Sequence, residues 1–316
     1  MFSVEQNQQG GITFFKLFNS NSGEFAEIAP GLGATVYRIG LSFDGKVQDI
    51  LAPDPVKTFR ENPFFRGRIL FPFNDRIKNG AYSYGGRSYQ LERNCAEDGS
   101  ALHGLVFDKH FSMLDAGETN SQAELVLSYS IEKDRYPGYP FPASLTLTYR
   151  LQEGRFAILF HVVNEGEETI PLSFGWHPYF TFDGSIDDAE LLCDGERYIE
   201  VEEDLFPTGN KPATKGSQFD FTSFRSLEGL DFDVGITAPS SGKTMLRQGN
   251  KVITMEQDAS VFAYTWLFTP PDHNSIAIEP VTSATDSFNM DNLGRIDFPA
   301  GGDISTWASV SASVET

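Results

Sequence analysis

The amino-acid sequence predicts an antiparallel all-β protein with few short helices. β-Branched and aromatic residues alternate with polar ones in short runs, of which 145–151 and 156–163 are examples, and this period of two is typical of strands. Glycine supplies the positive φ that tight hairpins need, and glycine pairs separate the runs at Asp44-Gly45, Gly85-Gly86, Glu153-Gly154 and Asp194-Gly195. Helical periodicity is scarce, and only residues 55–62 are expected to form a short helix.

The length of the chain leaves its domain count open. With 316 residues it has room for two ordinary domains, yet large all-β domains reach the same length. Neither an internal repeat nor a low-complexity linker divides the sequence. We therefore expect residues 1–316 to form a single domain. Hydrophobic residues make up 40% of the chain, which is enough for a substantial core.

The charge balance excludes two classes of partner. Lys and Arg number 24 and Asp and Glu number 44, so the net charge is −20 at pH 7. This charge repels phosphate backbones and anionic lipid surfaces, which disfavours nucleic acids and membranes as partners. The first residues lack the features of a secretory signal, and no apolar window is long enough to span a bilayer. These features predict a cytoplasmic protein with a neutral or cationic small-molecule ligand.

Cysteine and histidine spacing gives no sign of a metal site. Cys95 and Cys193 lie in unrelated contexts, so neither a zinc site nor a disulfide framework is indicated, and both are expected as reduced thiols. No two histidines have the paired helical spacing of metal ligands. The five are His103, His110, His161, His177 and His273.

Residues 173–180 place one histidine inside an aromatic segment. His177 is the titratable residue of this segment, and Trp176, Tyr179 and Phe180 are among its neighbours. Imidazole is the side chain whose ordinary pKa lies near neutrality, and aromatic faces exclude water and can stack on a ring-shaped ligand. Taken alone, the segment favours a packed core histidine. Three further polar stretches favour a functional site instead.

The first of these stretches ends an apolar run. Asn74, Asp75 and Arg76 follow residues 69–73 and precede a turn at Asn79-Gly80, which would present an amide and a guanidinium at the end of a strand. Such groups hydrogen-bond to sugar hydroxyls or carboxylates. The alternative is a surface turn with an ion pair between Asp75 and Arg76.

The other two stretches contribute His103 and Glu279. His103 stands beside Gly104, where a ligand can approach the backbone closely. Glu279 follows the apolar residues 276–278. A carboxylate at the end of an apolar strand is costly unless it is paired, solvated in a pocket or used in chemistry. Glu279 is therefore the single residue that argues best for function.

Taken in order, these stretches resemble the aldose 1-epimerases, also called galactose mutarotases, over about residues 25–305. Each motif is short, but four in the right order are specific together. The resemblance implies a large antiparallel β-sandwich of the galactose mutarotase type, or supersandwich. The motifs are residues 74–80, Asn94 with 102–104, 177–180, and 278–280 with 286–289.

The same resemblance implies roles for individual residues. Glu279 and His177 would be catalytic, and Arg76, His103 and an aspartate would contact the sugar. Asp231 follows a leucine as in the family pattern, so the resemblance favours it over Asp233. Asn74 is expected to fix Arg76 or the sugar, and the aromatic residues near His177, Trp176 among them, to stack on the C–H face of the sugar.

Two positions depart from the family pattern. Leu105 stands where many members have a second glycine after His-Gly, and we expect it to narrow the pocket. Trp176 precedes His177 where the galactose enzymes tend to have a small polar residue. The chemistry is unaffected, but the preferred sugar stays open.

The expected chemistry is the interconversion of α and β anomers through the open chain. It takes a proton from the anomeric hydroxyl and gives one to the ring oxygen. A carboxylate with a pKa of about 4.3 suits the first task, and an imidazolium with a pKa of about 6.5 suits the second. We expect Glu279 as base and His177 as acid, with the carboxylate raising the pKa of the imidazole. Neither a metal nor an organic cofactor is needed.

Three other functions stay open from the sequence. A non-catalytic carbohydrate-binding module would keep the sandwich and pocket without turnover. A glycoside hydrolase needs two carboxylates, and Asp231 with Glu279 could serve. A relative acting on hexose 6-phosphates needs added cations, and the candidates are Arg66, Arg68, Arg76 and Lys78. The oligomeric state is open between a monomer and a homodimer.

Overall fold

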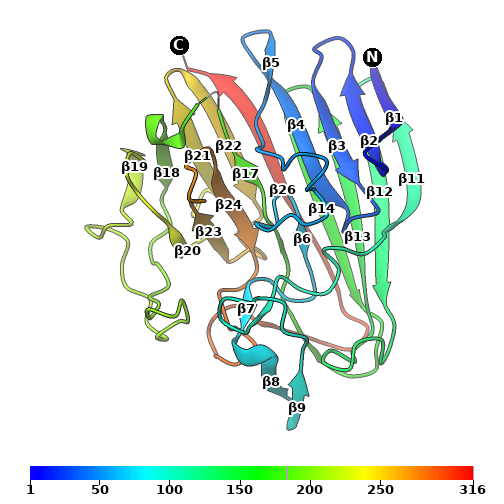
Figure 1. Ribbon diagram of the computed structural model, residues 1–316, viewed down its shortest axis with the longest axis vertical. Helices are drawn as coiled ribbons and strands as arrows, with labels where there is room; N and C mark the ends of the chain where they lie inside the picture. Colours follow the sequence, from blue (N-terminus) through cyan, green and yellow to red (C-terminus); the bar gives the residue numbers. More distant parts are fainter. Residues whose placement is uncertain (183, 316) are drawn as a thin grey trace.

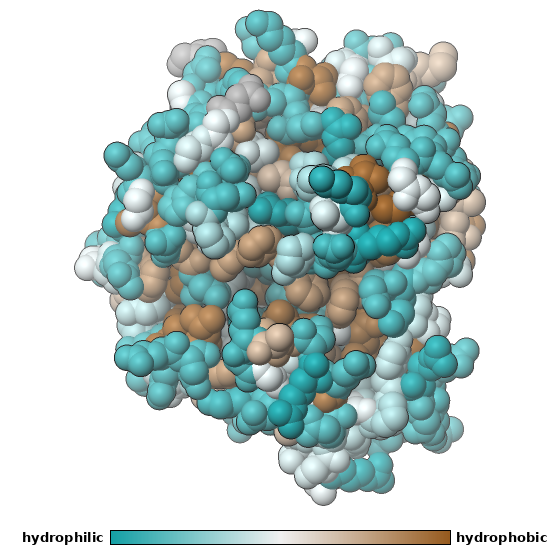
Figure 2. Space-filling view, in the orientation of Figure 1, coloured by the Kyte–Doolittle hydropathy of each residue, from teal (hydrophilic) through white to brown (hydrophobic). Residues whose placement is uncertain are grey.

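The computed structural model describes residues 1–182 and 184–315 as layers of antiparallel strands (Figure 1). The predicted all-β class is confirmed, since every pairing between the strands of these residues is antiparallel. Two single-turn 3-10 helices, η1 (Lys78–Gly80) and η2 (Ile186–Asp188), accompany the strands. Hydrophilic side chains cover most of the face seen in Figure 2, with hydrophobic ones between them.

Three large sheets make up the body of the molecule. The nine-stranded sheet has the order β11 (Ser112–Glu118), β12 (Gln122–Ile131), β13 (Ala143–Gln152), β14 (Arg155–Asn164), β26 (Asp303–Val314), β22 (Lys251–Gln257), β21 (Lys243–Gln248), β18 (Glu190–Cys193) and β19 (Phe221–Ser226). The five-stranded sheet has the order β1 (Phe2–Gln9), β2 (Ile12–Asn19), β3 (Phe25–Ala29), β4 (Thr35–Phe43) and β5 (Lys46–Asp49). The six-stranded sheet has the order β20 (Asp233–Thr237), β23 (Tyr264–Phe268), β24 (Ile276–Val281), β16 (Gly175–Trp176) and β6 (Ile69–Leu70), with β17 (Tyr179–Phe180) also paired to β24.

Short strand pairs complete the fold, and those of β7, β8 and β9 lie at one end of the molecule in Figure 1. These pairs are β7 (Arg76–Ile77) with β10 (Ala101–Leu102), β8 (Ala81–Tyr84) with β9 (Arg87–Gln90), and β15 (Ile170–Leu172) with β25 (Ile296–Phe298).

The alternation of apolar and polar residues along the strands gives each sheet one buried face, and these faces pack together in the sandwich. In β13 every second side chain is buried, from Ala143 to Leu151, because the period of a strand sends successive side chains to opposite faces. The buried face of the nine-stranded sheet packs on both other large sheets. Tyr149 hydroxyl donates to the backbone carbonyl of Ala34, and Phe156 packs on Trp176 of β16. β24, in contrast, is buried along its whole length.

Three of the four glycine pairs close two-residue hairpins. At Asp44-Gly45 both residues have positive φ, of 49° and 77°, between the paired residues Phe43 and Lys46, which is the twist that joins antiparallel strands. The fourth expectation, at Asp194-Gly195, is wrong. A Cβ added to Gly195 would lie 1.9 Å from the carbonyl oxygen of Thr237, so this glycine permits a close backbone approach instead.

The helix expected at residues 55–62 is also wrong. Turns replace it, with hydrogen bonds from Thr58 N–H to the Pro55 carbonyl and from Asn62 N–H to the Thr58 carbonyl. Asn62 leaves the helical region with φ of 33°. Its successor is Pro63, and a proline disfavours the α conformation of the residue before it.

No helix among the described residues has the length and apolar character needed to cross a bilayer.

Candidate active site

A cavity of about 480 Å³ opens beside the six-stranded sheet, within the range of about 300–1,000 Å³ typical of small-molecule sites. Its deep wall is polar and buried, whereas its rim is formed by more exposed residues of three loops, among them Glu97, Leu205 and Pro271. The polar residues of the deep wall are Asn74, Asp75, Arg76, His103, His177, Asp233 and Glu279.

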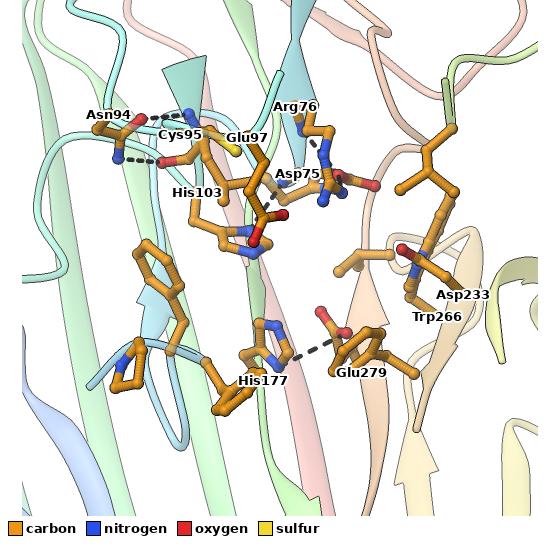
Figure 3. A pocket seen from close by; sticks show the side chains of 18 of the residues that line it. Asp75, Arg76, Asn94, Cys95, Glu97, His103, His177, Asp233, Trp266 and Glu279 are labelled. Atoms are coloured by element: carbon orange, nitrogen blue, oxygen red, sulfur yellow. Dashed lines mark hydrogen bonds and ion pairs between the residues drawn. The ribbon is translucent and has the colours of Figure 1, made fainter. Parts of the chain in front are cut away.

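The six-stranded sheet carries one side of the cavity. Glu279 in β24 is paired in register with Trp266 in β23, so both side chains lie on the same face. Asp233 is the first residue of β20, and the Trp266 indole N–H donates to its carboxylate at 2.8 Å. Figure 3 shows these three side chains around one side of the hollow, with His177 opposite.

His177 lies directly after β16, and its backbone is held on both sides. Its N–H donates to the Arg68 carbonyl at 3.0 Å, and its own carbonyl accepts from Gly67 N–H at 2.8 Å. The imidazole stacks on the Tyr179 ring, with centroids 5.0 Å apart and planes 7° apart. The ring points toward Glu279 (Figure 3).

The imidazole of His177 and the carboxyl of Glu279 meet in the cavity. His177 Nδ1 lies 3.5 Å from Glu279 Oε1, and the two residues are 4% and 3% exposed. Among the described residues, Nδ1 has no hydrogen-bond partner. A buried polar atom without a partner is costly, and this nitrogen is therefore available to a ligand in the cavity.

Burial controls the proton affinity of both groups. It lowers the pKa of His177 to about 3, with Arg66 and Arg76 adding to the effect. It raises the pKa of Glu279 well above its usual value, with further increases from Asp75 and Asp233. The expectation that Glu279 raises the pKa of His177 is therefore wrong. At 3.5 Å the pair makes no hydrogen bond, and desolvation outweighs their attraction.

Arg76 is the cation of the cavity. Its Nε donates to Asp98 at 2.9 Å, and its Nη1 lies 3.5 Å from Asp75 Oδ1. Burial alone would lower the pKa of Arg76, but Asp75, Asp233 and Asp98 together raise it. The guanidinium has five N–H donors, so donors remain for a ligand.

His103 faces the cavity as a neutral ring. Burial, His177 and Arg76 lower its pKa well below the ordinary value. Its Nδ1 accepts the backbone N–H of Asp75 at 3.3 Å. A neutral imidazole that accepts at Nδ1 carries its proton at Nε2, so His103 offers a donor to a ligand.

Asn74 lines the cavity but its side chain is already engaged. Its Nδ2 donates to the Ser283 carbonyl at 2.7 Å, and its Oδ1 accepts from the Ser283 hydroxyl at 3.1 Å. These bonds tie the segment before Arg76 to the segment after β24. Of the two expected roles, holding the Arg76 segment agrees with these contacts better than binding a sugar.

The choice of Asp231 as the cavity aspartate needs correction. Its side chain is 82% exposed and lies 3.0 Å from His273 Nε2, outside the cavity. Asp233 lines the cavity, and its pKa is raised to about 6 by burial and by Asp75. The sheet explains the difference, because Asp233 begins β20 whereas Asp231 precedes it. Asp231 therefore cannot form a carboxylate pair with Glu279.

Trp176 and Leu105 also lie away from the cavity. Trp176 is fully buried against Phe156 and Phe180, because a strand sends it to the face opposite its neighbour His177. The indole that lines the cavity is that of Trp266. Leu105 contacts the core and does not line the cavity, so it does not narrow it.

Sequence reasoning missed Asp98 and Trp266. Asp98 lies in an exposed loop with no local pattern around it, and only its contact with Arg76 reveals a role. Trp266 had a weak signal, since it lies in an aromatic-rich apolar run that ends at Phe268, eleven residues before Glu279.

Of the four cationic residues considered for a phosphate, Arg76 alone lines the cavity. Arg66 is buried near Asp54 and Ser275, and Arg68 donates to the carbonyls of Leu32 and Phe107. Lys78 forms an exposed ion pair with Asp204 at 2.9 Å.

Metal-ligating side chains and thiols bear on chemistry other than proton transfer. Within residues 1–182 and 184–315, no cluster of three or more His, Cys, Asp or Glu side chains has the arrangement of a metal site. Cys95 and Cys193 are free thiols, and Cys95 lies in the cavity rim.

The fold and the cavity together define a large antiparallel β-sandwich with an imidazole and a carboxyl facing each other in one polar hollow. The family model described as aldose 1-epimerase matches residues 19–293. The chain belongs to the aldose 1-epimerase family.

Individual relatives agree with this assignment. The chain is 28% identical over 170 residues to the galactose mutarotase of Homo sapiens, covering 51% of this chain and 46% of the relative. It is 27% identical over 209 residues to the maltose epimerase of Levilactobacillus brevis, covering 63% and 59%. The chain thus spans about half the length of the curated relatives it matches.

A solved structure supports the fold. The galactose mutarotase-like protein of Clostridium acetobutylicum superposes with a TM-score of 0.87 at 18% identity, covering 99% of both chains. The expected mutarotase-type sandwich is therefore confirmed.

Proposed function

We propose that this protein is an aldose 1-epimerase that interconverts the α and β anomers of a free aldohexose, with Glu279 as base and His177 as acid. The observation that carries the proposal is the pair itself. An imidazole nitrogen without a hydrogen-bond partner and a carboxyl oxygen lie 3.5 Å apart in one polar cavity.

Opening of the sugar ring requires two proton transfers, one to Glu279 and one from His177. Glu279 takes the proton of the anomeric hydroxyl while His177 gives a proton to the ring oxygen, and the bond between C1 and the ring oxygen breaks. Rotation about C1–C2 then presents the other carbonyl face. The ring recloses with the roles exchanged, so that Glu279 returns its proton and His177 recovers its own. No net proton is consumed.

The protonation state that burial favours fits this cycle. Burial favours a protonated Glu279 and a neutral His177. Ring opening produces that same state, since Glu279 has then gained a proton and His177 has lost one. We infer that the pair holds one proton throughout, and that sugar hydroxyls stabilise the charged form by hydrogen bonds when the cyclic sugar binds.

Four further residues would hold the sugar. Arg76 and His103 Nε2 would donate to its oxygens, and Asp233 would accept from its hydroxyls. Trp266, fixed through Asp233, offers an aromatic face beside Glu279. Asp233 and Trp266 here take the roles that the sequence suggested for Asp231 and Trp176.

The charge of the cavity favours a sugar without phosphate. Arg76 is surrounded by Asp75, Asp98 and Asp233, and no second cation of the candidate cluster lines the cavity. These carboxylates would repel a phosphate dianion, and the repulsion is strong because the cavity is poorly solvated.

Polarimetry tests the function directly. Freshly dissolved α-D-glucose, α-D-galactose and α-maltose, each followed with and without protein, cover the sugars that the names of the relatives suggest. Accelerated decay of rotation with at least one sugar is expected. Sugar binding without acceleration would instead indicate a carbohydrate-binding module.

A further inference from the structure

Asp75 is a buried carboxylate that the proposed reaction does not use. It is 6% exposed and has a left-handed backbone with φ of 60°. We propose that Asp75 is a positioning residue, which orients Arg76 and His103 and whose charge keeps the shared proton on the pair of Glu279 and His177. This inference rests on the function proposed above.

The side chain of Asp75 fixes Arg76. Its Oδ1 accepts the backbone N–H of Arg76 at 2.7 Å and lies 3.5 Å from Arg76 Nη1. Its Oδ2 accepts from the Thr285 hydroxyl. Thr285 lies shortly after β24, the strand that carries Glu279. One carboxylate therefore links the guanidinium to the segment next to the proposed base.

The backbone of Asp75 fixes His103. Its N–H donates to His103 Nδ1 at 3.3 Å, and its carbonyl accepts the backbone N–H of His103 at 3.1 Å. The left-handed conformation makes both contacts available, and aspartate tolerates it better than most residues do. The Phe65 ring packs edge-on against the same imidazole, at 4.6 Å between centroids. His103 is thereby held as a donor toward the cavity.

The charge of Asp75 acts on Glu279. After burial, Asp75 is the largest contributor to the raised pKa of Glu279, followed by Asp233. Asp98 also binds Arg76, by a 2.9 Å contact, but it is not among the groups that shift the pKa of Glu279. Asp75 and Asp98 therefore form a matched pair of test positions, because both hold Arg76 and only one acts on the base.

The experiment compares Asp75→Asn with Asp98→Asn. The asparagine at position 75 keeps the shape and can still accept from Arg76 N–H, but it removes the charge. The pH dependence of kcat/KM is measured by polarimetry, and the titration of the Glu279 carboxyl by infrared difference spectroscopy against Glu279→Gln. Both variants should raise KM several-fold, since Arg76 loses a charged partner.

Only Asp75→Asn should move the titration. Removing a negative charge makes Glu279 easier to ionise, so its carboxyl titration and the alkaline limb of kcat/KM should both shift to lower pH. An equal loss of activity at every pH with an unmoved carboxyl band would show a merely structural role and overturn the proposal. So would an equal shift in Asp98→Asn. If wild-type protein accelerates no mutarotation, the proposed function fails, and the infrared titration alone still decides the effect of Asp75.

Discussion

At the scale of single residues, the chemistry of His177 and Glu279 comes from burial more than from their mutual attraction. Each would be an ordinary titrating group in water, but the cavity pushes their pKa values in opposite directions. Groups with separated proton affinities are typical of acid–base sites. At 3.5 Å the two groups make no hydrogen bond to each other, so both can bond to sugar oxygens.

Removing the proposed base should stop turnover and leave binding. Glu279→Gln keeps the size of the side chain but cannot accept the anomeric proton, and a positioned acid or base contributes about 10²–10⁴-fold to rate. We expect kcat to fall by a factor of that order in polarimetry, with a sugar Kd from calorimetry within a few-fold of wild type. Normal mutarotation by this variant would remove Glu279 from the mechanism.

The pair of Glu279 and His177 should stay active below pH 6. Lowering the pH adds a second proton to the pair, and that proton must go to His177 when Glu279 already carries one. Burial holds the pKa of His177 at about 3, so the one-proton state survives far below the ordinary histidine value of about 6.5. Burial also raises the pKa of Asp233 to about 6, so the pH profile is measured in Asp233→Asn, where kcat/KM should change less than about twofold between pH 7 and pH 5. An acid limb near pH 6.5 would contradict this.

At the scale of elements, the pairing of β20 with β23 positions one wall of the cavity. Gly235 in β20 is opposite Trp266 in β23. A Cβ added to Gly235 would lie 2.3 Å from Trp266 Cζ3. The missing side chain therefore lets the indole lie across β20 and reach Asp233, two residues earlier on the same strand.

Gly235→Ala should displace the Trp266 indole. Overpacking of this kind costs about 1–3 kcal/mol, and the broken bond to Asp233 should raise KM. Denaturant unfolding and tryptophan fluorescence measure the two effects. Gly117→Ala in the exposed edge strand β11 is the control, because nothing lies within 4 Å of the added Cβ. Equal destabilisation by both variants would show that the indole contact is not the cause.

At the scale of the whole molecule, one core connects the sheets. The main hydrophobic cluster includes residues from Phe2 in β1 to Val310 in β26. Strands of the nine-stranded sheet pack on the five-stranded sheet through β2 and β4, and on the six-stranded sheet through Trp176. We therefore propose that residues 1–316 form a single domain.

This arrangement predicts one unfolding transition. Scanning calorimetry should give a single peak whose calorimetric and van't Hoff enthalpies agree, because no sheet keeps a complete hydrophobic face after the others unfold. Two separated peaks would divide the chain into independent units.

The sequence predicted what depends on local chemistry. Alternation in 143–151 and the turn at Asp44-Gly45 specify strands and a hairpin from neighbouring residues alone. The resemblance also gathered His177, Glu279, Arg76 and His103 correctly into one cavity. Features that depend on where a strand begins or which face it presents were less accessible. The position at which β20 begins decides that Asp233, and not Asp231, lines the cavity.

Electrostatics was the other part that sequence could not supply. The direction of the His177 shift depends on burial, on Arg66 and on Arg76, and none of these can be weighed before the packing is known. The turns at 55–62 similarly depend on the side chain of Asn62, whose amide bonds both backbone groups of Arg66.

The cavity takes its reacting groups and its rim from different parts of the chain. Glu279 belongs to a strand buried along its whole length, whereas Glu97, Leu205 and Pro271 project from connecting loops. Loops accept substitution far more readily than buried strands do. Substitutions at those three rim positions should therefore alter which carbohydrate binds. The positions of Glu279 and His177, which transfer the protons, should stay the same.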